Sequence, residues 1–198
     1  MNASVLSDRL LQIRGVHWLA SRFGGVRLRR LSFDAKFRNG TWDFQNESPS
    51  LVRLVEQYSG GGHILVLGCG ACPIASALPV YSYTSLLGVD LSPEAVALAS
   101  SRHNLPNVRF EVHEMNEFQC ARLYDVILFS DSLYYVQRSL REKLLRRLCR
   151  HLSPNGHIVV AIAEPQRYAT ILEMIRANFQ VEVDGPLKHE ERHVLVFK

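Results

Sequence analysis

Short runs of apolar residues alternate with segments of helical periodicity along most of this chain, and this alternation constrains the fold more than any other feature. The runs at 64–67, 86–89 and 126–129 contain no polar side chain, which is typical of strands buried on both faces of a parallel sheet. Further strands are predicted at 108–112 and 158–162, and helices at 73–78, 93–102, 138–152 and 167–177. This order of elements predicts a doubly wound α/β sheet with helices on both faces.

The last two predicted strands interrupt the alternation. Residues 179–183 and 194–197 are joined by a charged loop that has no room for a crossover helix, so we expect the two strands to be antiparallel to each other. The predicted fold is therefore a Rossmann-like seven-stranded sheet, parallel except for a C-terminal antiparallel hairpin strand. A nucleotide-dependent redox domain would continue to alternate strand and helix.

The N-terminal part is predicted to be a helical and irregular cover. Residues 4–20 have the periodicity of an amphipathic helix, and residues 26–47 are expected to be irregular. Ser48 and Pro49 indicate the start of a helix that runs to about Tyr58. We expect one domain over residues 1–198, with 1–59 as a cover or substrate segment and 60–198 as the ligand-binding core.

Composition narrows the class of protein. The 198 residues, 47% of them hydrophobic, suit one domain, and no apolar run approaches the ~20 residues that span a bilayer. The N-terminus lacks the pattern of a secretory signal, and the four cysteines are spaced irregularly. These features predict a cytoplasmic protein with no membrane association, either a monomer or a homodimer.

The net charge of +4 is concentrated near the N-terminus, because residues 1–41 contain eight basic and two acidic residues. This excess fits a solvated helix and loop, and it leaves a nucleic-acid partner open as an alternative. The basic residues within 138–152 have the same two interpretations, of which a solvated outer face is the expected one. Residues 154–156, with the sequence PNG, are expected to form a turn.

A glycine-rich loop follows the first apolar strand, and an acidic residue ends the second. Gly68 and Gly70 can adopt positive φ and allow the backbone to approach a ligand closely, just before a helix that begins at Pro73. Asp90 lies 20 residues after Gly70, where a carboxylate can accept hydrogen bonds from both hydroxyls of a ribose. Ligands bind at the carboxyl ends of the strands in such sheets, so this spacing predicts a nucleotide-like ligand there.

Four segments resemble the motifs of class I S-adenosylmethionine (SAM)-dependent methyltransferases. They are VLGCG at 66–70, GVDLSPEA at 88–95, YDVILFS at 124–130 and LSPNGH at 152–157, and the resemblance covers about residues 60–198. Within the family, the chain is most similar to small nodulation-type sugar N-methyltransferases, through DSLYYV at 131–136 and the Trp42-Asp43 segment. The resemblance implies SAM as cofactor and methyl transfer to a nitrogen or oxygen of a small molecule, such as a sugar or a biosynthetic intermediate.

The resemblance also implies roles for individual residues of the first two motifs. Gly68, Cys69 and Gly70 would lie against the methionine part of SAM. Asp90 would hold the ribose, and Leu91 would pack on the adenine.

Further cofactor contacts are expected from three other segments. Asn116, Glu117 and Phe118 follow the third strand, where the family contacts the adenine, and the amide of Asn116 can bond its amino group. Ser130 would face the cofactor from the end of the fourth strand. Trp42 is expected to close over the cofactor as part of a lid.

Two positions depart from the family pattern. Val66 stands where the first motif normally has an acid, and Cys72 takes the third small position of the loop. Impaired SAM binding would make the chain a noncatalytic partner subunit, which is one alternative hypothesis. Cys69 and Cys72 also have the spacing of a redox or metal pair, but no second pair accompanies them, and we expect no metal.

The best-placed candidate catalytic residues follow the fourth strand. SAM carries its own electrophilic methyl group, so the protein has to align the acceptor, and a hydroxyl acceptor needs a base. Asp131 can orient or neutralise an amine, and Tyr135 can line the sulfonium through its π face. Because residues 1–41 are basic, methylation of RNA or protein is the alternative to a small-molecule acceptor.

Overall fold

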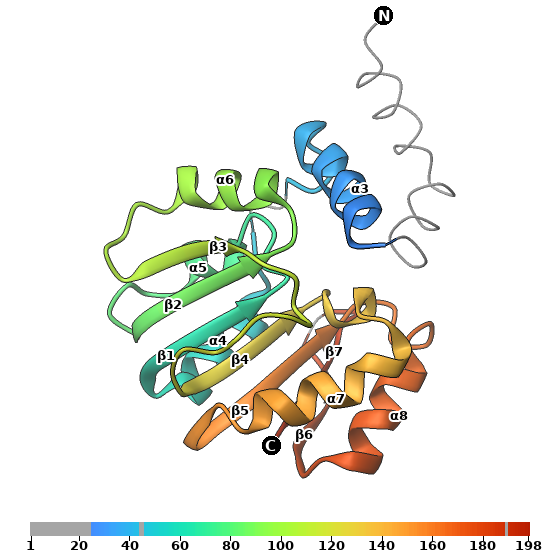
Figure 1. Ribbon diagram of the computed structural model, residues 1–198. Helices are drawn as coiled ribbons and strands as arrows, with labels where there is room; N and C mark the ends of the chain where they lie inside the picture. The colour runs from blue at the N-terminus through green and yellow to red at the C-terminus, as the bar shows by residue number, and fades with distance from the viewer. Residues whose placement is uncertain (1–24, 44–45, 189) are drawn as a thin grey trace, which may run out of the picture.

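The computed structural model describes residues 25–43, 46–188 and 190–198, which form a seven-stranded sheet with helices on both faces (Figure 1). The strand order is β3-β2-β1-β4-β5-β7-β6, and β7 runs antiparallel to both of its neighbours. This arrangement confirms the predicted fold class and the C-terminal hairpin. The strands are β1 (Gly61–Leu67), β2 (Tyr83–Asp90), β3 (Val108–Val112), β4 (Tyr124–Ser130), β5 (Leu152–Ile162), β6 (Val181–Pro186) and β7 (His193–Phe197).

Helices cover the sheet in two layers, each with its own apolar core. One core joins the sheet to α4, α5 and α6, and the other joins it to α7 and α8. Ser48 and Ser92 cap α4 and α6, each accepting a hydrogen bond from a backbone N–H three residues later and each followed by proline. The helices are α3 (Val26–Arg38), α4 (Pro49–Ser59), α5 (Pro73–Ala77), α6 (Pro93–Arg102), the 3-10 turn η1 (Leu133–Tyr135), α7 (Arg138–Cys149) and α8 (Ala169–Asn178).

The strand order reverses between β1 and β4 at the centre of the sheet. Chain connections lead from β1 outward through β2 to β3, and from β4 outward in the opposite direction to β5. The carboxyl ends of β1 and β4 therefore flank a crevice, which is where ligands bind in open α/β sheets.

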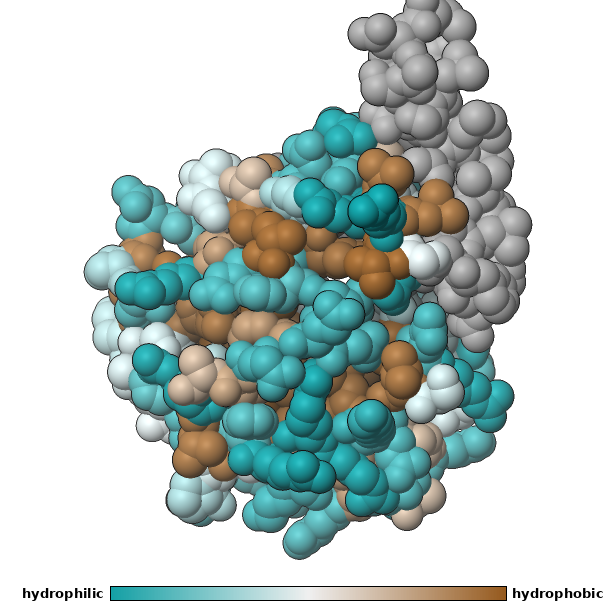
Figure 2. Space-filling model, in the orientation of Figure 1, coloured by the Kyte–Doolittle hydropathy of each residue, from teal (hydrophilic) through white to brown (hydrophobic). Residues whose placement is uncertain are grey.

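The helix α3 corrects the prediction that residues 26–47 are irregular. Its buried side includes Arg29 and Lys36, whereas Leu28 and Leu31 are 44% and 51% exposed, so hydrophobic periodicity gives no helical signal here. Figure 2 shows hydrophobic residues at the surface in the region of α3. None of the residues of α3 belongs to either core cluster. The helix predicted at 4–20 lies outside the described residues.

Three predictions around α7 also need correction: the end of the helix at residue 152, the turn at 154–156 and the solvated basic face. The helix ends at Cys149, and residues 154–156 belong to β5, where the pairing with β4 is irregular between Tyr124 and Val126. The basic side of α7 is not uniformly solvated, because Arg141 is buried and donates hydrogen bonds to the carbonyls of residues 134 and 136. Within the described part of the chain, no helix is long and apolar enough to cross a membrane.

Candidate functional site

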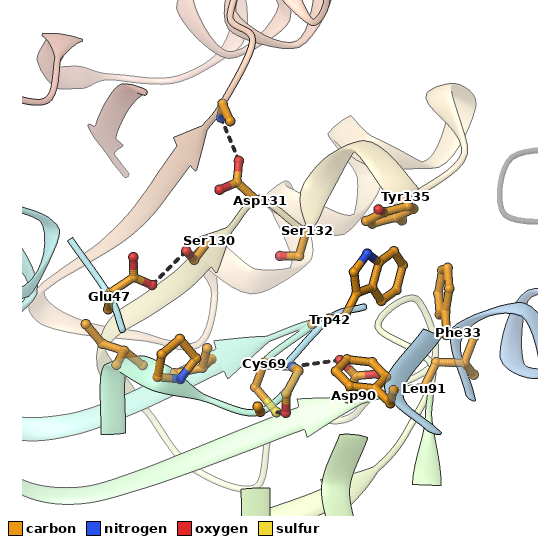
Figure 3. Close-up of a pocket in the computed structure, with 18 of the residues that line it drawn as sticks. Phe33, Trp42, Glu47, Cys69, Asp90, Leu91, Ser130, Asp131, Ser132 and Tyr135 are labelled. Atoms are coloured by element: carbon orange, nitrogen blue, oxygen red, sulfur yellow. Dashed lines mark hydrogen bonds between the residues drawn. The ribbon is translucent and has the colours of Figure 1, made fainter. Parts of the chain in front are cut away.

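A cavity of about 450 Å³ lies at the carboxyl ends of β1, β2 and β4, beneath α3 (Figure 3). This volume falls within the range of pockets that bind small molecules and cofactors. Predicted site residues supply much of its wall: Trp42, Gly68, Cys69, Gly70, Asp90, Leu91, Ser130, Asp131 and Tyr135.

The loop after β1 approaches the cavity with its backbone. Gly68 and Gly70 have φ of +69° and +56°, the left-handed region that favours glycine. The N–H groups of Gly68 and Cys69 both donate to the carbonyl of Val89, at 2.8 and 3.0 Å, and so hold the loop against β2. A Cβ at Gly68 would lie 2.5 Å from the Cβ of Ser132, so only glycine fits there without displacement.

Asp90 ends β2 beside this loop. Its carboxylate accepts hydrogen bonds from the backbone N–H groups of Gly70 and Ser92, both at 2.9 Å. Burial raises the pKa of Asp90 to about 6, the two backbone hydrogen bonds oppose this rise, and the nearby Asp34 adds to it. Each oxygen keeps lone pairs for further donors, so the carboxylate can accept the hydroxyls of a ligand.

The helix α3 is attached to the rest of the site through buried polar contacts. Arg29 forms an ion pair with Glu114 at 2.9 Å, both side chains being 7% exposed, and donates to the carbonyl of Tyr135 at 3.4 Å. Ser92 donates to Asp34 at 2.5 Å. These contacts position α3 over the end of β3 and over the turn that follows β4.

Aromatic rings form the wall of the cavity beneath α3. The ring of Trp42 lies 5.5 Å from Phe33, 5.6 Å from Phe37 and 6.0 Å from Tyr135, measured between ring centroids. Figure 3 shows Phe33, Trp42 and Tyr135 grouped on the side of the cavity that holds Asp90. The predicted lid residue Trp42 and the predicted catalytic residue Tyr135 are thus brought together.

A cluster of polar side chains lies on the other side of the cavity, and its members come from segments that are far apart in the sequence. Arg192 forms ion pairs with Glu47 at 2.6 Å and with Asp131 at 3.1 Å, and it donates to Ser130 at 2.5 Å. Ser130 also donates to Glu47 at 3.0 Å. Sequence reasoning found Ser130 and Asp131 but missed Glu47 and Arg192, because no local motif marks residues 145 positions apart.

Asp131 follows β4 in a left-handed conformation with a φ of +51°. One of its carboxylate oxygens accepts the backbone N–H of Ala163 at 2.6 Å. Burial raises the pKa of Asp131, while the guanidinium of Arg192 and this hydrogen bond oppose the rise. The carboxylate is thus held in one orientation at the cavity wall.

The family model that describes a methyltransferase domain matches residues 64–156, which include β1, the glycine loop, Asp90 and β4. Residues 64–156 are thus a methyltransferase domain, which resembles those of the class I SAM-dependent enzymes.

Individual methyltransferases are similar to this chain in sequence. Malonyl-acyl carrier protein O-methyltransferase of Bacillus cereus is 29% identical over 165 residues, 82% of this chain and 57% of that protein. Nodulation protein S of Azorhizobium caulinodans is 28% identical over 140 residues, 68% of this chain and 67% of that protein. The chain therefore spans between about half and two thirds of the length of these curated relatives.

Solved methyltransferase structures share the fold. The N-methyltransferase NodS of Bradyrhizobium japonicum WM9, crystallised with S-adenosyl-L-homocysteine (SAH), aligns with a TM-score of 0.63 and 18% identity over 99% of this chain and 98% of its own. A TehB-like SAM-dependent methyltransferase of Corynebacterium glutamicum aligns with a TM-score of 0.64 and 21% identity over 87% of this chain and 98% of its own. At these identities the likeness concerns the fold.

The two departures from the methyltransferase pattern lie in the wall of the site. Val66 is buried and lines the cavity, and Cys72 is fully buried with a φ of +54°. A non-glycine residue in this conformation costs on the order of 1–3 kcal/mol. The cysteines of the loop are free, and a hydrogen bond with Cys72 together with burial raises the pKa of Cys69 well above its usual value. The raised pKa of Cys69 and the burial of both side chains favour a packing role over a redox pair.

The segment after β3 differs from the predicted adenine contact. Asn116, Glu117 and Phe118 do not line the cavity, whereas Met115 does. The side chain of Asn116 donates to Glu114 at 3.2 Å, and Phe118 packs in the core beneath β4 and α7. A role for these three residues in cofactor binding remains a prediction.

Proposed function

We propose that this protein transfers the methyl group of SAM to a nitrogen or oxygen atom of a small molecule. One observation carries the proposal: a single cavity has the glycine loop and Asp90 on one side and Asp131 on the other. A cofactor and an acceptor can therefore meet between two carboxylates with different environments.

The residues on the Asp90 side fit SAM. The left-handed glycines bring backbone within reach of the methionine part, and the buried carboxylate of Asp90 retains acceptor capacity for ribose hydroxyls. Leu91 and the aromatic rings offer apolar surface for the adenine and the sulfonium. When bound, SAM supplies an activated methyl group.

The chain's own residues would orient the acceptor and exclude water. Trp42 and Tyr135 close the cavity on the cover side, so that the reacting atoms are shielded from solvent. Asp131 would accept a hydrogen bond from the acceptor and take up its proton, because its carboxylate is fixed at the cavity wall. Burial of Tyr135 raises its pKa, which supports a neutral ring as wall rather than a base.

The contacts of the cover favour a small acceptor over RNA. In the described part of the basic N-terminal segment, Arg29 and Lys36 are buried, and Arg38 lies 3.2 Å from Glu94. The buried Arg29 and Lys36 add nothing to an exposed basic surface. Of the exposed Arg27, Arg30 and Arg38, the last two lie beside Asp34 and Glu94, which offset part of their charge. We therefore rank RNA or protein methylation second, and we include a cytoplasmic location and a monomeric or homodimeric state in the proposal.

Calorimetric titration with SAM and SAH is the first test. We expect both to bind with one site per chain, and Asp90→Ala to lose most of the affinity. A folded chain that binds neither ligand would disprove the proposal and support a noncatalytic partner subunit. SAH release from SAM in the presence of a panel of small amines and alcohols then identifies the acceptor, and sedimentation of the same sample measures the oligomeric state.

RNA binding and RNA methylation test the second-ranked function. We expect no salt-dependent RNA binding by the full chain at low ionic strength. Tight binding that is lost when residues 1–41 are deleted, together with methylation of the RNA, would favour the second-ranked function.

A further inference from the structure

Arg192 lies between two carboxylates on the acceptor side of the cavity. Its Nη1 contacts Glu47 at 2.6 Å, and its Nη2 contacts Ser130 at 2.5 Å and Asp131 at 3.1 Å. Its Nε atom is buried, so a ligand in the cavity cannot reach it. Both terminal nitrogens of this guanidinium thus already contact a carboxylate, and its Nε is buried.

The charge on this side of the cavity is negative in spite of the arginine. Glu47 and Asp131 carry one negative charge each, and Arg192 balances one of them. An anionic acceptor would meet the uncompensated charge and would have to displace a carboxylate from Arg192, which is costly in a partly desolvated site. A hydrogen-bond donor meets no such barrier.

The two carboxylates differ in their access to a ligand. The side chain of Glu47 is 7% exposed, and it also accepts the N–H of Ser48 at 2.9 Å. The side chain of Asp131 is 32% exposed and is held at both oxygens, by Arg192 and by the N–H of Ala163. Asp131 is therefore the group that faces an acceptor, while Glu47 holds Arg192 in place.

We propose that Arg192, fixed by Glu47, is a positioning residue that presents Asp131, and that this side of the cavity takes a hydrogen-bond-donating acceptor group and excludes carboxylates and other anions. The inference rests on the proposed function, because it assigns the acceptor class of the same site. It predicts that Arg192 is not an anchor for an anionic substrate.

Anion binding distinguishes an Arg192 that positions Asp131 from an Arg192 that anchors an anionic substrate. Acetate is titrated into SAH-saturated protein, using the wild type, Arg192→Gln and the double variant Glu47→Gln/Asp131→Asn. We expect no acetate binding to the first two and measurable binding to the double variant, in which Arg192 is uncompensated. Binding to the wild type that is lost in Arg192→Gln would overturn the proposal, as would a double variant that binds SAH but no acetate.

The pKa of Asp131 tests whether Arg192 positions this carboxylate, because an Arg192 that only supported the fold would leave that pKa unchanged. The carboxyl carbon of Asp131 is followed by 13C NMR as the pH is varied, in the wild type, Arg192→Lys and Arg192→Gln. We expect the pKa of Asp131 to rise in Arg192→Gln and to rise less in Arg192→Lys, which keeps the charge but cannot form both contacts. An unchanged titration in a variant that still binds SAH would refute the role of Arg192.

SAH binding is measured on every sample. Loss of SAH binding in the wild type would defeat the proposed function, whereas retained SAH binding with the wrong acetate or titration result would defeat only the present inference.

Discussion

The two sides of the cavity are built in different ways. Asp90 is held by backbone N–H groups of residue 92, close to it in the sequence, and of residue 70, in the loop that follows the adjoining strand. Asp131 is held by one backbone N–H, that of Ala163, and by Arg192, which Glu47 in turn holds from a distant part of the chain. The side that we propose for the cofactor depends on backbone geometry, whereas much of the side that we propose for the acceptor depends on side chains that single substitutions can change.

Under this proposed division of roles, one fold can keep its cofactor while its acceptor varies. A substitution at Glu47 or Arg192 changes charge and shape without moving the loop between β1 and α5. A substitution in that loop disturbs the backbone that approaches the cofactor.

Gly68→Ala should have the largest effect. The new Cβ would stand 2.5 Å from the Cβ of Ser132 at a φ of +69°, so we expect a loss of roughly 2–4 kcal/mol in the free energy of unfolding, together with weaker SAM binding. Denaturant titration and calorimetry measure both quantities. The control is Gly185→Ala, where nothing lies within 4 Å of the added Cβ and stability should stay near wild type. Equal changes in stability and SAM affinity in the two variants would show that the loop does not require glycine at position 68.

Asp90→Ala and Asp131→Ala compare the two carboxylates directly. Asp90→Ala should weaken SAM binding by about 1.5–3 kcal/mol, the usual value of hydrogen bonds to a charged group, because it removes the ribose acceptor. Asp131→Ala should leave SAM affinity nearly unchanged and lower the rate of methyl transfer. Calorimetry gives the affinities, and similar losses in both variants would contradict the division of roles.

The pKa of Asp90 predicts how SAM binding depends on pH. The carboxylate form accepts the ribose hydroxyls, so affinity should be constant well above the pKa of about 6 and should fall below it, by up to about tenfold per pH unit. Calorimetry between pH 5 and 8 measures this profile. Asp90→Asn should bind more weakly with a flat profile, and a flat wild-type profile would exclude titration of Asp90 in this range.

Trp42→Ala should have the smallest of these effects. Loss of the ring contacts with Phe33 and Tyr135 should weaken SAM binding by about 1 kcal/mol, roughly fivefold. The matched surface control is Tyr81→Ala, since Tyr81 is 92% exposed and outside the cavity. An unchanged affinity in Trp42→Ala would show that this ring packs α3 without shielding the cofactor.

Sequence predicted the parts of the molecule that local pattern determines. The apolar runs located β1, β2 and β4, because each run lies within a few neighbouring residues. The 20-residue spacing of Gly70 and Asp90, which spans one strand–helix–strand unit, located one side of the cavity. The pattern failed at α3, whose buried side carries Arg29 and whose exposed side carries Leu31. It also failed for Glu47 and Arg192, because only the folded chain brings an isolated glutamate and an isolated arginine together.

The polar attachment of α3 has a consequence for the order in which the molecule opens. A helix that lies outside both core clusters, and is held by an ion pair, hydrogen bonds and the aromatic contacts of Phe33, exposes less apolar surface when it detaches than the opening of either core does. Its amides should therefore exchange with solvent through a local opening that depends weakly on denaturant, while those of β4 exchange only through global unfolding. If ligands enter by this route, the rate of that local opening sets an upper limit on the turnover of the whole protein.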